Sequence, residues 1–165
     1  MDFKERLLKA KKFGDIFDIV QDIVHDFLGL DQAGLVIGVT DLGIYENGFI
    51  GAFYSPDANM IIINKKPLQR ILQKSPLLYN NYIFHVMLHE YIHSVGSLDE
   101  AETRSIVFKI SDNYFGDSHT VTKLAGDIKK FLPDLTYVDK EFALPKDINI
   151  EFVSGIDRRN ANYIN

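Results

Sequence analysis

Two histidines four residues apart, with a glutamate directly after the first, form the most chemically distinctive stretch of the chain: His89-Glu90-x-x-His93. Residues four apart lie on the same face of an α-helix, so both imidazoles can point at one small cation such as zinc. Glu90 lies about 100° further round the helix. Its carboxylate would reach a water on the cation but is poorly directed to be a ligand. The pattern therefore predicts a zinc hydrolase in which Glu90 is the general base.

The residues around this motif predict the helix that it needs. Ser75 is a typical N-cap, Pro76 suits the first helical position, and Gly96 is a typical helix end. A helix of about twenty residues fits between them and carries the motif in its last two turns. The alternative is a surface helix with two unrelated histidines.

A catalytic zinc site takes a third protein ligand and leaves one position for water. Three acidic residues follow the motif closely: Asp99, Glu100 and Glu102. A second helix is expected to begin there, because Ser97 and Glu100 have the spacing of a capping box. Alternatively, Glu100 only closes that capping box and Asp99 only favours the helix dipole. The residues by themselves leave the third ligand open.

These residues resemble those of the zincin metallopeptidases, which implies that His89 and His93 bind one zinc ion per chain and that Glu90 activates water. The substrate would be a peptide or protein. In the gluzincin branch the third ligand is a glutamate on a following helix. Residues 100–104, Glu-Ala-Glu-Thr-Arg, resemble the E-x-E-A-D run of that branch in their first and third positions and depart from it in the last two. The resemblance implies Glu100 as the third ligand.

The metzincin branch provides a competing placement. Residues 93–99, His-Ser-Val-Gly-Ser-Leu-Asp, match its extended motif, with Asp99 as the ligand. Metzincins also have a methionine turn downstream, whereas the methionines of this chain are Met1, Met60 and Met87. We therefore favour Glu100, with Asp99 second and Glu102 third. The chain most resembles small, soluble archaeal-type minimal gluzincins, over roughly residues 35–110.

The remaining pattern predicts a single α+β domain over residues 1–165. By resemblance the fold is zincin-like, with a small, mostly antiparallel sheet packed on the metal-binding helix and on the glutamate helix that follows it. Residues 2–30 have helical spacing and are expected to break at Gly14, with Asp15 as a cap. Further helices are expected at 67–73 and 122–132. Strand-like runs lie at 34–40, at 48–54 after an Asn47-Gly48 turn, and at 60–64. Their spacing suits a small, largely antiparallel meander, a hairpin with one more strand alongside.

Two further expectations concern the substrate cleft. By resemblance, the strand at 60–64 would be the edge strand that pairs with an extended substrate. Residues 133–165 read as an irregular tail, but one too apolar for a free end. That tail either completes the core or partly covers the cleft, which would inhibit the enzyme.

Composition sets the class of protein. Apolar residues make up 46% and charged residues 25% of the chain, as is ordinary for a globular domain. A net charge of −5 without any basic run argues against a nucleic-acid partner. There is no cysteine, which excludes thiolate zinc sites, and no signal-peptide or membrane-spanning pattern. We expect a cytoplasmic protein with no membrane partner.

Other residues and functions stay open at this stage. His85 lies one turn before His89, but three histidines over two turns span about 12 Å, so all three cannot bind one metal; we expect His85 to lie behind the site or in the cleft. His119 is a candidate fourth ligand, and Tyr91, Tyr114 and His119 are candidate donors to the oxyanion. The alternative functions are a latent or non-peptidase zinc hydrolase, and a zinc-binding regulatory module without turnover.

Overall fold

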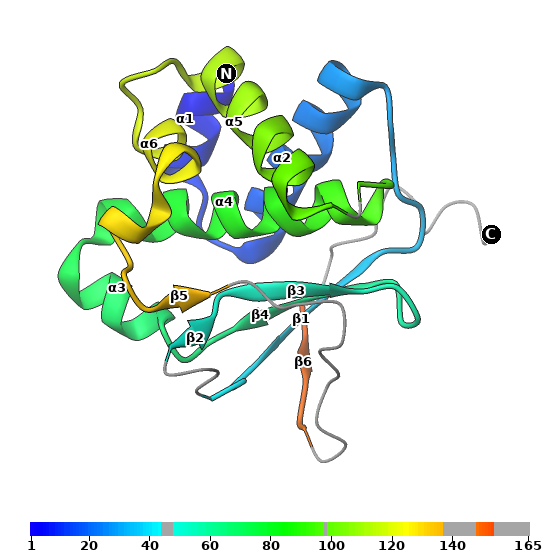
Figure 1. The fold of residues 1–165 in the computed structure, drawn as a ribbon, viewed down its shortest axis with the longest axis vertical. Helices are drawn as coiled ribbons and strands as arrows, with labels where there is room; N and C mark the ends of the chain where they lie inside the picture. The colour runs from blue at the N-terminus through cyan, green and yellow to red at the C-terminus, as the bar shows by residue number, and fades with distance from the viewer. Residues whose placement is uncertain (44–47, 98, 137–147, 154–165) are drawn as a thin grey trace.

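The fold was analysed in a computed structural model, which describes residues 1–43, 48–97, 99–136 and 148–153. These residues form an α+β fold in which one long helix, α4, lies between a small mixed sheet and the helices α1, α2, α5 and α6 (Figure 1). The helices are α1 Phe3–Lys9, α2 Phe13–Leu28, α3 Leu68–Lys74, α4 Pro76–Ser94, α5 Glu100–Phe115, α6 Thr120–Gly126 and the 3-10 turn η1 Ile128–Lys130. The strands are β1 Val36–Thr40, β2 Phe49–Ile50, β3 Ala52–Ser55, β4 Met60–Asn64, β5 Leu135–Thr136 and β6 Glu151–Phe152.

The main sheet has the order β3-β4-β1-β6 and mixes both strand directions. β4 pairs antiparallel with β3 and parallel with β1, while β6 pairs antiparallel with β1. A second, two-stranded sheet pairs β2 with β5 in parallel. The predicted hairpin with one more strand alongside is confirmed, since β3 and β4 form the hairpin and β1 lies beside it. The meander is wrong, because β1 pairs with β4 and runs parallel to it.

The expectation that residues 60–64 form the edge strand is also wrong. Every residue of β4 is buried, and the strand lies between β3 and β1. A continuous apolar run such as Met-Ile-Ile-Ile is typical of a strand covered on both faces, which belongs inside a sheet. The edge is β3, whose residues Tyr54 and Ser55 are only partly buried.

The N-terminal helices break earlier than predicted. The interruption covers residues 10–12, and Gly14 lies in the first turn of α2. Asp15 does act as a cap, because its carboxylate accepts hydrogen bonds from the backbone N–H groups of Lys11 and Lys12, each at 3.1 Å. The chain therefore turns before the glycine, where Asp15 satisfies the free donors of the helix start.

Later helices follow their local signals with two differences. The expected helix over 67–73 is found as α3. α5 is capped by Asp99, not by Ser97, and the side chain of Asp99 accepts from the N–H of Glu102 at 3.0 Å. The helix expected over 122–132 instead ends at Gly126 and is followed by the separate turn η1.

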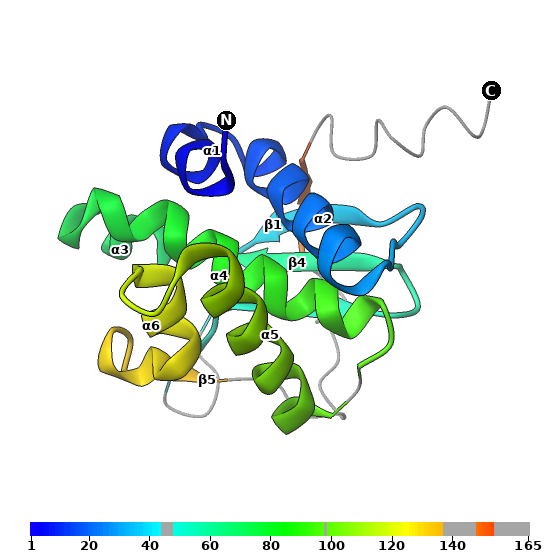
Figure 2. The ribbon, with the colours of Figure 1, turned by 90° about the horizontal axis from the view of Figure 1, so that it is seen from above.

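Helix α4 is the centre of the packing. It is buried on most of its surface, including Tyr82, Phe84 and Tyr91, because the sheet covers one side while α2, α5 and α6 cover the others (Figure 2). The sheet approaches α4 closely: a Cβ at Gly51 would lie 2.7 Å from the Tyr82 hydroxyl. Such enclosure holds the side chains of α4 in fixed positions, which a metal site requires.

The segment after residue 133, predicted to be irregular, contributes a strand to each sheet. β5 carries Leu135, which is only 2% exposed, and β6 covers the side of β1 away from β4. The other residues of this segment, 137–147 and 154–165, lie outside the described part of the chain, as does the proposed covering of the cleft by the tail. Within the described residues, no helix has the length and apolar character needed to cross a membrane.

Candidate metal centre

The end of α4 and the start of α5 bring three side chains together. The predicted helix is found with the predicted start, since the Ser75 hydroxyl accepts from the N–H of Leu78 at 3.3 Å. His89 and His93 occupy its last two turns. Helix α4 ends at Ser94, and α5 begins at Glu100. The short connection places the first residue of α5 opposite the two histidines.

The three side chains converge on one point. The Nε2 atom of His89 lies 3.1 Å from one carboxylate oxygen of Glu100, and Nε2 of His93 lies 2.7 Å from the other. All three donor atoms lie within 4.8 Å of one another. Two imidazole nitrogens and a carboxylate oxygen are a donor set that zinc prefers. The group formed by His89, His93 and Glu100 can therefore hold a metal ion.

The spacing of these atoms suits a four-coordinate ion after a small adjustment. With metal–ligand bonds of about 2.1 Å, tetrahedral donors lie about 3.4 Å apart. The observed separations of 2.7 and 3.1 Å are hydrogen-bond distances to the two different oxygens of Glu100, so its carboxylate would move away from both imidazoles to admit a metal ion. Glu100 is partly exposed and free to make that adjustment, while His89 is fully buried.

The ring of His93 is oriented by the connection between the helices. Its Nδ1 atom lies 2.6 Å from the Ser97 carbonyl oxygen. This contact favours the tautomer with the proton on Nδ1, which leaves the Nε2 lone pair directed at the metal position. Thr103 supports the arrangement, since its hydroxyl lies 2.9 Å from that of Ser97. The sequence analysis did not identify Ser97 or Thr103 in this role.

Glu90 lies beside the group without joining it. Its carboxylate is 4.0 Å from Nε2 of His89 and is 5% exposed. Burial raises the pKa of Glu90 to about 7, although the two imidazoles and a hydrogen bond from the backbone N–H of Tyr54 act in the opposite direction. A carboxylate that gains and loses its proton near neutrality is suited to general acid–base chemistry. The Tyr54 contact had no signal in the sequence, because it involves a backbone group of a distant strand.

Glu100 and His93 stabilise each other's charged forms. Burial alone would raise the pKa of Glu100, but hydrogen bonds and charge from His89 and His93 lower it far below its usual range. Burial would likewise lower the pKa of His93, yet the hydrogen bond with Glu100 and the charge of Glu90 raise it. The group thus already attracts positive charge at the point where a cation would bind.

The two other acidic candidates have different positions. Asp99 caps α5, and Glu102 is exposed on its first turn. Neither belongs to the group of converging donors found in the described residues. The geometry therefore singles out Glu100 among the three candidates.

The other predicted site residues lie elsewhere. His119 caps α6, where its Nδ1 accepts from the N–H of Val121, so it is not placed as a fourth ligand. The Tyr91 hydroxyl accepts from the N–H of Gln32, and Tyr114 donates to Asp26. These hydroxyls are engaged with α2 and the loop after it, and the structure does not bring them to the metal group.

His85 is buried one turn before His89. It is 3% exposed, and neither of its ring nitrogens has a hydrogen-bond partner in the described residues. Burial, with a smaller contribution from the charge of His89, lowers the pKa of His85 to about 3. His85 is therefore a neutral imidazole and lies outside the metal group.

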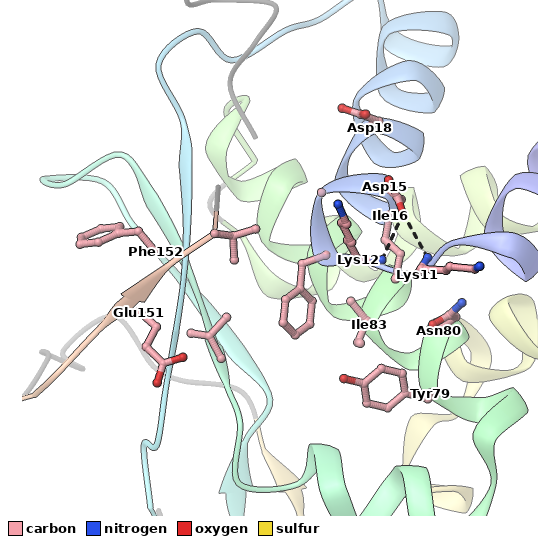
Figure 3. A pocket seen from close by; sticks show the side chains of 14 residues that line it. Lys11, Lys12, Asp15, Ile16, Asp18, Tyr79, Asn80, Ile83, Glu151 and Phe152 are labelled. Carbon is pink, nitrogen blue, oxygen red and sulfur yellow. Dashed lines mark hydrogen bonds between the residues drawn. The ribbon is translucent and has the colours of Figure 1, made fainter. Parts of the chain in front are cut away.

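A hollow of about 640 Å³ lies away from this group, between the start of α2, the first turns of α4 and β6. Figure 3 shows Glu151 on one side of it, facing Tyr79 and Asn80 of α4, with Lys12 of the helix connection above. None of the three converging residues lines it.

No family model, curated protein or solved structure matches the chain. The chemistry of the site is therefore argued from its own residues.

Proposed function

We propose that the protein is a zinc-dependent metallopeptidase. The observation that carries this proposal is the convergence of His89, His93 and Glu100 on one point, with the buried carboxylate of Glu90 beside it. A structural metal site would need the first three residues but not Glu90. The residues match the ligand set and general base of the gluzincin metallopeptidases, which the H-E-x-x-H motif and the following glutamate already resemble.

In the proposed reaction, bound zinc would act as a Lewis acid toward a water molecule and the scissile carbonyl. Glu90 takes the proton from the attacking water and returns it to the leaving amine. Its pKa of about 7 suits both steps, since it can hold the proton transiently near neutral pH. The N–H of Tyr54 holds the Glu90 carboxylate in place.

The position of β3 supports a peptide as substrate. β3 has β4 along one side only in the described sheet, and Tyr54 of β3 reaches Glu90 through its backbone. An extended peptide can add to such an edge through backbone hydrogen bonds. The peptide would then lie beside both Glu90 and the metal group. This proposal places the substrate along β3 and not along residues 60–64.

The test combines metal content with cleavage of an unfolded protein substrate. We expect about one zinc per chain, lost in His89→Ala and in His93→Ala. Glu90→Gln should keep zinc but lower turnover by about 10² to 10⁴, the usual contribution of a general base. Glu102→Gln, on the exposed face of α5, is the matched control and should leave both properties unchanged.

Three outcomes would overturn the proposal. Failure of the wild-type protein to bind zinc after reconstitution would remove its basis. Near wild-type turnover in Glu90→Gln would exclude this mechanism. Zinc binding without cleavage of any peptide bond would instead favour the regulatory module or a hydrolase for another bond.

A further inference from the structure

A pocket of about 400 Å³ lies next to the metal group, where α4, α5, α6 and β5 meet. Figure 2 shows α5, α6 and β5 on the same side of α4. The walls are about equally polar and apolar and come from all four elements; their buried residues include His85 from α4, Val107 from α5, Leu124 from α6 and Leu135 from β5. We call this the His85 pocket.

The His85 pocket begins one helical turn from the metal group on both helices. His85 precedes the ligand His89 by four residues on α4. Arg104, which also lines the pocket, follows Glu100 by four residues on α5. Four residues correspond to about 6 Å along a helix axis. A residue next to a scissile bond at the metal group is therefore within reach of the pocket.

His85 is the polar group in the pocket that lacks a partner. Both of its ring nitrogens are buried and without a hydrogen bond in the described residues. A neutral imidazole offers one N–H donor and one acceptor nitrogen, and leaving such groups unsatisfied is unfavourable. A neutral ligand hydroxyl or amide could satisfy one of them, either by accepting from the N–H or by donating to the bare nitrogen.

Charge does not select the occupant of this pocket. Its charged residues Arg104, Asp127 and Lys129 are all exposed and carry both signs. The buried part offers apolar walls and the uncharged His85. A side chain with an apolar body and a neutral hydrogen-bonding tip fits both features, and the volume has room for an aromatic ring.

We propose that the His85 pocket binds a substrate side chain of this kind, above all tyrosine, next to the scissile bond, and that His85 determines the specificity. The phenol hydroxyl can donate to the bare nitrogen of a neutral imidazole or accept from its N–H, so it can pair with whichever nitrogen it reaches. The inference about a substrate side chain rests on the proposed peptidase function; the pocket's preference for a neutral hydrogen-bonding group does not.

The pocket is tested first without catalysis, by comparing p-cresol with toluene as probes. Binding is followed by the NMR signals of the His85 ring and of the methyl groups of Val107 and Leu124. The wild type should bind p-cresol about tenfold more tightly than toluene, the usual effect of one buried hydrogen bond. The preference should vanish in His85→Leu and persist in His85→Gln, which keeps a donor and an acceptor. The control Val107→Ala should weaken both probes alike.

The second test uses peptide pairs in which Tyr replaces Phe, or Gln replaces Glu, beside the cleaved bond. The zinc-loaded wild type should prefer the Tyr and Gln peptides, and His85→Leu should lose both preferences while keeping its zinc. Equal binding of the two probes, a preference that survives in His85→Leu, or a preference for Glu would overturn the inference. If no peptide is cleaved, the peptidase proposal fails, and the probe experiment still decides the chemistry of the pocket.

Discussion

Acid should destabilise this protein through His85, and replacing that residue with leucine should remove the effect. In the folded chain burial lowers the pKa of His85 to about 3, whereas an unfolded chain has the ordinary histidine value of 6.5. Between these two values the unfolded state takes up a proton that the folded state refuses. Stability is therefore lost as the pH falls below 6.5, and the loss is complete near pH 3.

The size of the effect follows from the two pKa values. They differ by about 3.5 pH units, which corresponds to a total of about 5 kcal/mol. Between pH 7 and pH 5, His85 should lower the free energy of unfolding by about 2 kcal/mol. That is a large share of the stability of a typical domain, about 5 to 15 kcal/mol.

The measurement is urea unfolding of the metal-free wild type and of His85→Leu at pH 7, 6 and 5. Working without metal removes any loss of stability caused by metal release. Other titrating groups, such as Glu100 and His93, are present in both proteins and largely cancel in the difference. As the pH falls from 7 to 5, the free energy of unfolding of the variant should rise by about 2 kcal/mol relative to that of the wild type. Parallel curves would show that His85 takes up its proton in the folded state and is not enclosed as the structure shows.

The other predictions concern the third ligand and the C-terminal segment. Glu100→Ala should weaken zinc binding far more than Glu102→Ala. Asp99→Ala should keep zinc but lower the unfolding free energy by about 1 kcal/mol, as loss of a helix cap does. Loss of zinc from Asp99→Ala alone would instead favour Asp99 as the third ligand, the metzincin-like placement. Truncation before Asp134 should give an unstable or aggregated chain by thermal melting and size-exclusion chromatography, because it removes the buried Leu135 and both pairings of the segment. A shortened chain that stays folded and cleaves faster would show instead that the segment is inhibitory.

Local signals predicted the functional helix well. The bounds of α4 depend on Ser75 and Pro76 at one end and Gly96 at the other, all within the segment itself. The positive φ of Gly96, +128°, is a conformation that other residues rarely adopt, so the helix end is also encoded locally. Spacing of four residues then places His89 and His93 on one face without any knowledge of the rest of the fold.

Non-local pairing could not be predicted in the same way. Strand order depends on which segments exchange hydrogen bonds, and the spacing of strands along the chain does not determine which segments do so. The unbroken apolar run of β4 was the available signal for an interior strand. β5 and β6 have two residues each, too few to show an alternating pattern. For that reason the segment after 133 read as irregular.

In the site, too, some groups are marked by local sequence signals and others are not. The side chains of His89, Glu90 and His93 followed from the motif, while the groups that orient them are the Ser97 carbonyl and the Tyr54 N–H. Every residue has these backbone groups, so no residue type marks them. Only the path of the chain brings them to the site.

The row of histidines on α4 shows how the neighbouring helix decides which two of three evenly spaced histidines share one carboxylate. His85, His89 and His93 have the same spacing, so α4 alone could offer either adjacent pair to a metal. α5 begins at Glu100 and places its carboxylate between His89 and His93, 3.1 and 2.7 Å from their nitrogens. About two turns further along α5, the buried Val107 lines the pocket that His85 also lines. His85 thus meets an apolar wall where the other two meet a carboxylate. The connection between the helices therefore places Glu100 beside His89 and His93 and leaves His85, which lies outside that group, without a carboxylate partner.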